Sequence, residues 1–245
     1  MHLVRATALG TIFMLALILV PAWTLRYWQG WAYTIVFTIC SGAYTGYLAK
    51  HDPALLRRRT EVGVSHARET TQKIVIALFF VACIVLLVLS PLDVRFGWSS
   101  MPWEASIVGD VLVAFSFCIF YLVAKVNTYA AANVRVEAGQ KVVSTGVYEF
   151  VRHPMYFAAL FFLLGTPVAL GSFWTLLLFP VFIPLLVARI LNEERVLARD
   201  LPGYIEYHAC PNVIRTESAG WLVEGHPAPR RIEKAACPAG FSRTG

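Results

Sequence analysis

The stretch YFAALFFLLGTPVALGSFWTLLLFPVFIPLLVARIL, Tyr156–Leu191, decides the fold. It holds two apolar runs, Tyr156–Leu170 and Ser172–Leu191, and the stretch LGTPVALGS, where the first run ends, contains helix-breaking residues (Gly165, Pro167 and Gly171). Such residues favour a break in the chain. A helix that crosses a bilayer needs about 20 apolar residues, and the first run is shorter. The pattern therefore predicts a helical hairpin that enters the membrane and returns to the side where it began.

Four further apolar runs precede this hairpin, at Ala6–Leu25, Gly30–Leu48, Lys73–Leu92 and Ile107–Val126. The chain is 58% hydrophobic and 15% charged, with a mean hydropathy of +0.61, which is too apolar for an ordinary soluble domain. The N-terminal stretch MHLVRATALGTIFMLALILVPA has a basic start and an apolar core, as signal peptides do, but no convincing small-residue cleavage site follows, so we expect it to be retained as a span. The composition predicts an all-α integral membrane protein with about five to six transmembrane helices.

The charged residues indicate how the spans are oriented. The net charge is +6, but the basic residues lie in short loops between apolar runs, so we expect no nucleic-acid partner. Basic residues gather in the loops before Lys73 and before Arg152, whereas the opposite loops hold little beyond Arg26 and Arg95. The positive-inside rule predicts that both termini and both basic loops are cytoplasmic. Nothing in the sequence indicates an oligomeric state.

The end of the chain differs in character from the rest. From Asn212 the sequence is polar, rich in Gly, Pro and Ala, and without periodicity, which predicts a disordered cytoplasmic tail over 212–245. Residues 1–211 then form one membrane domain. The five cysteines lack metal-ligand spacing, so we expect no metal site.

A first polar cluster, STGVYEFVRHPMY (Ser144–Tyr156), lies directly before the hairpin. Pro154 suits the first turn of a helix, where its missing N–H costs nothing. Arg152 offers a planar fork that fits carboxylates, and His153 can donate a hydrogen bond or titrate near neutral pH. The same residue types also gather at helix ends as interfacial anchors, and that interpretation stays open.

A second polar cluster, ARILNEERVLARD (Ala188–Asp200), ends the hairpin. Glu193 and Glu194 follow directly on an apolar run, where carboxylates are costly unless they have a task or a partner. Arg189 is spaced to pair with Glu193 on one helix face. A helix that emerges into water with mixed charge is the alternative. If the hairpin brings both clusters together, they suit a zwitterionic ligand with ribose hydroxyls, such as S-adenosylmethionine.

The motif region 139–207 resembles a known family of membrane enzymes. The segments GQKVVSTGVYEFVRHPMYFAALFFLLGTPVALGS and ARILNEERVLARDLPGYIEY are similar to the isoprenylcysteine carboxyl methyltransferases, part of a wider group that includes phospholipid N-methyltransferases. Upstream, DPALLRRRTEVG resembles the DPxLLxxR stretch of bacterial members. After Tyr207 the chain departs from the family pattern. The resemblance implies a multi-span helical methyltransferase that binds S-adenosylmethionine at the cytoplasmic face.

The resemblance also implies roles for particular residues. Arg152 and Arg189 match arginines near the reacting groups and are candidate catalytic residues that orient the acceptor or a carboxylate. The candidate cofactor-binding residues flank the hairpin on both sides (Gln140, Val142, Gly146, Tyr148, His153, Pro154, Tyr156, Glu193 and Glu194). Methyl transfer from an activated sulfonium needs mainly alignment of the reactants and exclusion of water, which a site without a Ser–His–Asp arrangement can supply.

The expected reaction is methyl transfer to a lipophilic or small amphiphilic acceptor that enters from the bilayer, with a carboxylate, thiol or amine as the nucleophile. One alternative is a membrane reductase of related architecture that uses NADPH, although no Gly-rich dinucleotide fingerprint is present. Another is a non-catalytic membrane scaffold protein. A transporter is disfavoured because the sequence shows no intramembrane charges that pair across spans.

Overall fold

The computed structural model describes residues 2–60, 70–130 and 142–205, and all regular secondary structure in these ranges is helical. The elements are α1 (His2–Ala22), α2 (Trp28–His51), α3 (Pro53–Thr60), α4 (Thr70–Phe96), α5 (Trp103–Val126), the 3₁₀ helix η2 (Gly146–Glu149), α6 (Pro154–Ala169), α7 (Phe173–Leu176) and α8 (Phe179–Asp200). The predicted tail and parts of both basic loops lie outside these ranges.

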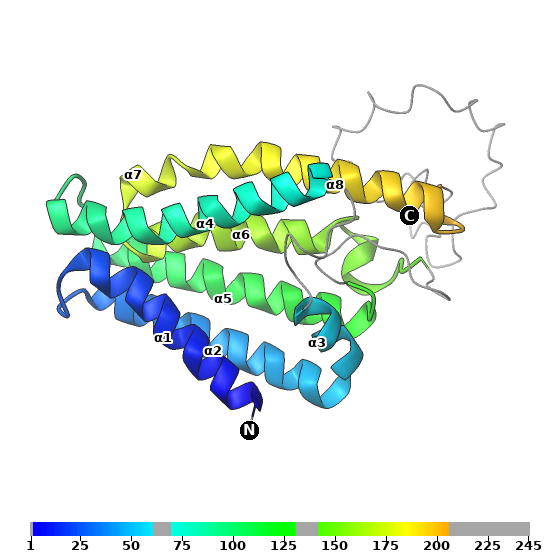
Figure 1. Ribbon diagram of the computed structural model, residues 1–245, viewed down its shortest axis with the longest axis horizontal. Coiled ribbons are helices and arrows are strands. Elements are labelled where there is room, and N and C mark those ends of the chain that lie inside the picture. Colours follow the sequence, from blue (N-terminus) through cyan, green and yellow to red (C-terminus); the bar gives the residue numbers. More distant parts are fainter. Residues whose placement is uncertain (1, 61–69, 131–141, 206–245) are drawn as a thin grey trace, which may run out of the picture.

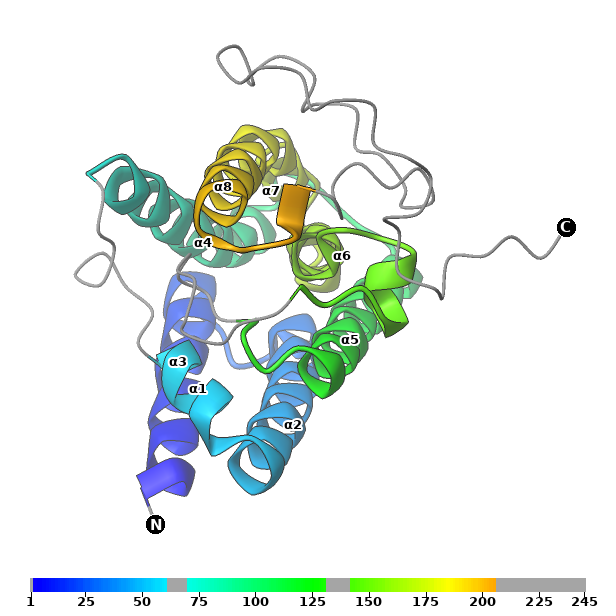
Figure 2. The ribbon, with the colours of Figure 1, turned by 90° about the vertical axis from the view of Figure 1, so that its right-hand side faces the viewer.

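The long helices form a bundle around α6 (Figure 1). Helix α6 contacts α2, α4, α5 and α8, while α1 packs against α2 and α4 on the far side (Figure 2). Its sequence is apolar on every face, which is typical of a helix enclosed by others. Side chains such as Leu163 and Thr166 are accordingly buried. The bundle thus holds the first arm of the predicted hairpin at its centre.

In the described ranges, three helical segments are long and apolar enough to cross a membrane: Lys73–Phe96, Trp103–Val126 and Phe173–Asp200. Two shorter apolar helices, Thr7–Ala22 and Pro154–Ala169, lie beside them. The prediction of an all-α membrane protein is therefore confirmed in its fold class. The count of five to six spans stays a prediction.

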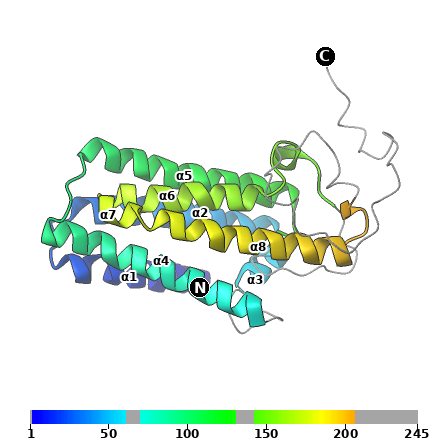
Figure 3. The ribbon, with the colours of Figure 1, turned by 90° about the horizontal axis from the view of Figure 1, so that it is seen from above.

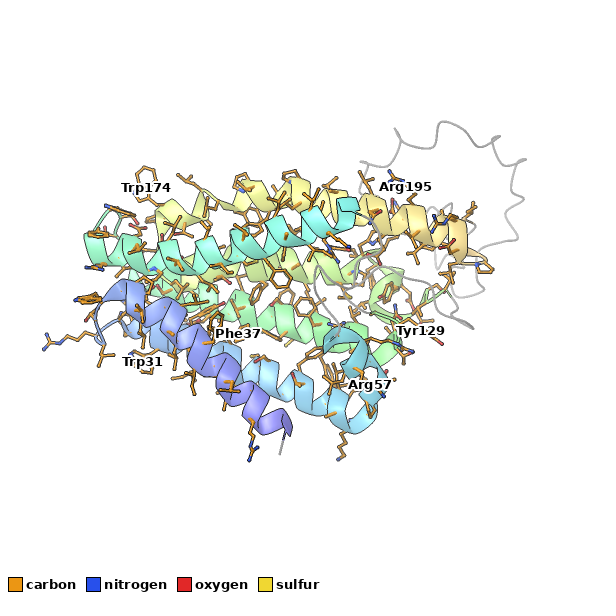
Figure 4. The ribbon with its side chains drawn as sticks, in the orientation of Figure 1. Trp31, Phe37, Arg57, Tyr129, Trp174 and Arg195 are labelled. Atoms are coloured by element: carbon orange, nitrogen blue, oxygen red, sulfur yellow. The ribbon has the colours of Figure 1, made fainter. Side chains whose placement is uncertain are left out.

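The two ends of the bundle differ in chemistry (Figure 4). One end, here called the tryptophan end, carries exposed indole rings (Trp23, Trp28, Trp31, Trp98, Trp103 and Trp174). The opposite end, here called the α3 end, carries α3 with its three consecutive arginines and the charged last turns of α8. Indole rings favour a membrane–water interface and arginines favour water. This separation is what a bundle that spans a bilayer requires.

Helices α6 and α8 run antiparallel and form a hairpin (Figure 3). The connection passes through Gly171, whose φ of 75° is left-handed, and Ser172, whose hydroxyl accepts a hydrogen bond from the Thr175 amide at the start of α7. Two prolines, Pro180 and Pro184, lie in the second arm of the hairpin. The interruption between α7 and α8 comes just before Pro180, which lies in the first turn of α8, where a proline costs little.

A buried carboxylate fastens the tryptophan end. Asp93 of α4 is 1% exposed, and it accepts hydrogen bonds from the Ser99 amide at 2.8 Å, the Ser99 hydroxyl at 2.6 Å and the Ser172 hydroxyl at 2.5 Å. These bonds join the end of α4, the α4–α5 loop and the hairpin turn. Because the donors are buried or half-buried, they need this acceptor.

Replacing Asp93 with alanine is expected to lower the free energy of unfolding by about 2–4 kcal/mol, since it leaves several donors without a partner. Thermal unfolding in detergent, followed by circular dichroism, measures this loss. Ser100→Ala is the matched control in the same loop, because Ser100 is exposed. An Asp93→Ala protein as stable as the control would contradict the stabilising role of the Asp93 hydrogen bonds.

Candidate active site

The start of α6 positions the first cluster. His153 is the N-cap residue and Pro154 is the first helical residue, as the sequence predicted. The His153 carbonyl accepts hydrogen bonds from the amides of Tyr156 and Phe157, at 3.1 and 3.0 Å. The proline fixes the backbone as the helix begins, so the His153 ring is held at the open end of the hairpin. The ring centroids of His153 and Tyr156 are 5.8 Å apart.

The two clusters meet at this open end. His153 Nε2 lies 2.9 Å from Glu194 Oε1, and the two side chains are only 10% and 12% exposed. The residues are 41 positions apart in the chain. They come together because α6 leaves the α3 end, the chain turns at Ser172, and α8 returns past the start of α6 (Figure 1). Two motifs predicted separately thus form one polar site.

A second contact lies beside this pair. Charge interactions and side-chain hydrogen bonding link the Tyr156 hydroxyl to Glu193 and Arg189 of α8. Arg189 and Glu193 were expected to face the same way, and the structure turns both of them toward α6. The tyrosine joins a carboxylate and a guanidinium in a largely apolar region. Such a contact orders both side chains before any ligand binds.

Arg152 is the most buried charged residue of the first cluster, with 8% of its surface exposed. Its Nη1 atom finds no hydrogen-bond partner in the part of the chain that the structure describes. A buried cation is costly when its donors are unused, because it has lost its water shell. The free donor suits an oxyanion that arrives with a ligand. This is the chemistry expected of a carboxylate-binding group.

The loop before α6 also approaches the segment after α8. Val142 packs with Leu201 and Tyr204, so both sides of the predicted site meet here as well. Gly146 adopts a φ of 64°, and its amide donates to Glu149 Oε1 at 3.0 Å, which closes a tight turn at η2.

The same loop contains two further candidate cofactor-binding residues, Tyr148 and Gln140. The Tyr148 hydroxyl accepts a hydrogen bond from Asn127 Nδ2 at 2.8 Å, and its ring packs among apolar side chains of α5 and α6. These contacts give it a structural task. Gln140 lies outside the described residues.

One residue of the α3 end escaped the sequence analysis. Arg59 ends the DPxLLxxR stretch but was given no role in the site, yet its Nη2 lies 3.6 Å from Met155 Sδ, inside the RHPMY motif. The DPxLLxxR stretch explains the placement. Asp52 accepts a hydrogen bond from the Leu55 amide at 2.8 Å at the start of α3, and Leu55 is fully buried. The cap and the buried leucine set the helix so that its last turn faces α6.

A comparison with protein families agrees with this arrangement. Residues 105–201 match the family model described as phospholipid methyltransferase. No curated protein and no solved structure matches the chain. The matched region runs from α5 to the end of α8 and contains both polar clusters. For residues 105–201, the match confirms the resemblance to the wider group that includes the phospholipid methyltransferases, while the closer resemblance to the isoprenylcysteine carboxyl methyltransferases stays a prediction.

Proposed function

We propose that this chain is an integral membrane methyltransferase that uses S-adenosylmethionine and methylates a lipophilic or small amphiphilic acceptor. The observation that carries the proposal is the contact between His153 and Glu194, which joins the two polar clusters inside the region that matches the methyltransferase family. In this proposal the α3 end faces the cytoplasm, in accord with its arginines, and the tryptophan end faces the opposite side.

The residues present fit the cofactor that the family implies. S-adenosylmethionine carries a carboxylate, an amino group and ribose hydroxyls. The unpartnered Arg152 Nη1 suits the carboxylate, and Glu193 and Glu194 suit the amino group or the hydroxyls. His153 and Tyr156 supply ring faces and polar atoms at the same place. We expect these five residues to hold the cofactor.

The site fits a reaction that needs alignment more than acid–base power. When bound, S-adenosylmethionine supplies an activated methyl group. The chain has to orient the acceptor against it and keep water away, and the low exposure of His153, Glu194 and Arg152 favours this. A carboxylate or thiolate acceptor needs no strong base. For an amine acceptor, His153 Nε2 beside Glu194 is a suitable place for the released proton.

Methyl transfer itself tests the proposal. Purified protein in lipid nanodiscs is incubated with methyl-tritiated S-adenosylmethionine and separate panels of amine, thiol and carboxylate amphiphiles. We expect label in one panel of the organic extract and none with heat-denatured protein. Consumption of NADPH without any methyl transfer would contradict the proposal and favour a membrane reductase.

A further inference from the structure

A second group of unused donors lies at the α3 end, outside the region that matches the family model. This group consists of two buried donors that have no hydrogen-bond partner within the described residues: Nε of Arg59 on α3 and the hydroxyl of Tyr44 on α2. The guanidinium carbon of Arg59 is 5.3 Å from the centre of the Tyr44 ring. Two donors without a partner thus lie on neighbouring side chains, and the methyl-transfer chemistry described above uses neither of them.

The surroundings of Arg59 offer it no anion. Its Nη2 contacts the Met155 sulfur, a weak acceptor, and its other electrostatic neighbours are the hydroxyls of Tyr44 and Tyr148. Among the residues that the structure describes, no carboxylate pairs with it. Burial lowers the pKa of Arg59, and the two tyrosines only partly oppose this effect. A cation that has lost water without gaining a counter-ion is unusual unless a ligand provides one.

The neighbouring residue, Arg58, has a structural role in this helix. Arg58 donates from Nη1 to the Thr128 carbonyl at 2.8 Å and stacks on Tyr129 with its guanidinium 5.2 Å from the ring centre. These contacts fasten α3 to the end of α5. Because Arg58 already serves this purpose, fastening α3 does not account for the buried and unused Nε donor of the half-buried Arg59.

The position of Arg59 connects it with the candidate active site. It contacts Met155, three residues after Arg152, whose own Nη1 is buried and unpartnered. Tyr44, over whose ring Arg59 lies, packs against a buried apolar cluster of Leu48, Leu55 and Ala124. A positive group at the end of an apolar bundle, next to apolar side chains, matches a molecule with an anionic head and a hydrocarbon chain.

We propose that Arg59, assisted by the Tyr44 hydroxyl, binds the phosphate or carboxylate head of a membrane amphiphile beside the start of α6. This inference rests on the proposed function in one respect: the amphiphile is taken to be the methyl acceptor. The anion-binding site itself does not depend on methyl transfer. If the amphiphile is the methyl acceptor, the acceptor carries an oxyanion close to the group that is methylated.

Binding of three amphiphiles with the same chain tests the proposal. The probes are 1-oleoyl lysophosphatidate, oleate and 1-oleoylglycerol, and isothermal titration calorimetry of the full chain in detergent measures their binding. We expect at least one of the two anions to bind wild-type protein about tenfold or more tightly than the neutral glyceride, which is the size of a charge-assisted contact. Which anion binds distinguishes phosphate from carboxylate.

Variants of two arginines in α3 test whether Arg59 is responsible for this preference. Arg59→Gln is expected to lose most of the preference for the anion, whereas Arg57→Gln, which removes the same charge from an exposed position of the same helix, is expected to keep it. Arg59→Lys retains the charge but not the planar fork, and we expect an intermediate preference and normal thermal unfolding. Preference retained in Arg59→Gln, or lost equally in Arg57→Gln, would overturn the proposal.

Two further readouts separate this site from others. Displacement of lysophosphatidate by an equal concentration of inorganic phosphate would show that the site binds a free anion, and it would overturn the proposed amphiphile. Calorimetry with S-adenosylhomocysteine should give the same affinity in wild type and Arg59→Gln, and a loss in the variant would place Arg59 in the cofactor site instead. If wild type fails to bind S-adenosylhomocysteine while the anion preference holds, the proposed function fails and the anion site stands.

Discussion

Replacing Gly109 with alanine is expected to lower the free energy of unfolding by about 3 kcal/mol or more. Helices α5 and α6 make the most extensive contact in the bundle, and Gly109 of α5 lies directly against the backbone of α6. A Cβ atom on Gly109 would lie 2.1 Å from the Ala169 amide nitrogen and 2.6 Å from its Cα. These are backbone atoms of α6, so no side chain can rotate away. Close helix packing through small residues is typical of membrane bundles.

Thermal unfolding in detergent measures this effect. A loss of about 3 kcal/mol in a chain of this size corresponds to a melting temperature lower by about 6–12 °C. Gly46→Ala is the matched control, because a Cβ at Gly46 of α2 meets nothing within 4 Å. Alanine also favours a helix over glycine, so the control should be as stable as wild type or slightly more. Equal melting temperatures for both variants would show that α5 and α6 do not approach so closely.

Replacing Glu194 with alanine is expected to reduce the rate of methyl transfer by about 100-fold or more, which corresponds to about 2.7 kcal/mol of transition-state stabilisation. The substitution removes the group that lies 2.9 Å from His153 Nε2 and leaves that ring unsupported at the centre of the site. The initial rate of label transfer from tritiated S-adenosylmethionine measures the loss. Asp200→Asn, at an exposed position of the same helix, should keep the wild-type rate.

The pair should also act as a unit. If His153 and Glu194 function through their mutual contact, the double variant His153→Asn/Glu194→Ala should be little slower than either single variant. Rate losses that multiply would mean that the two residues act independently. That result would be compatible with a separate role for each residue, but it would contradict a site in which the two residues act through their contact.

The sequence predicted the central part of this arrangement because each signal was local. Long apolar runs mark the helices, and the Gly- and Pro-rich break before Ser172 indicates that the chain turns back. Once α6 and α8 are antiparallel, the polar segments that begin and end the hairpin must meet. His153 and Glu194 could therefore be brought together without coordinates. The free Arg152 donor could not, because it depends on how neighbouring side chains fill the space.

Other features depend on contacts between distant segments that have no periodic signal. Asp93, Ser99 and Ser172 are ordinary polar residues at helix ends, and only packing shows that they form one clamp. Arg59 belongs to a run of three arginines that any basic loop could contain. The spacing from Asp52 to Arg59 was the available signal, and its meaning needed the direction of α3 relative to α6.

Calorimetric binding of S-adenosylhomocysteine to detergent-purified, folded protein tests the central claim most directly. We predict saturable binding to one site per chain in wild type, with affinity about tenfold or more weaker in both Glu193→Ala and His153→Ala and unchanged in Asp200→Asn. Loss in both variants would show that the two ends of the hairpin hold one ligand. Absence of binding to wild type, or full binding in both variants, would contradict a cofactor site between the two clusters.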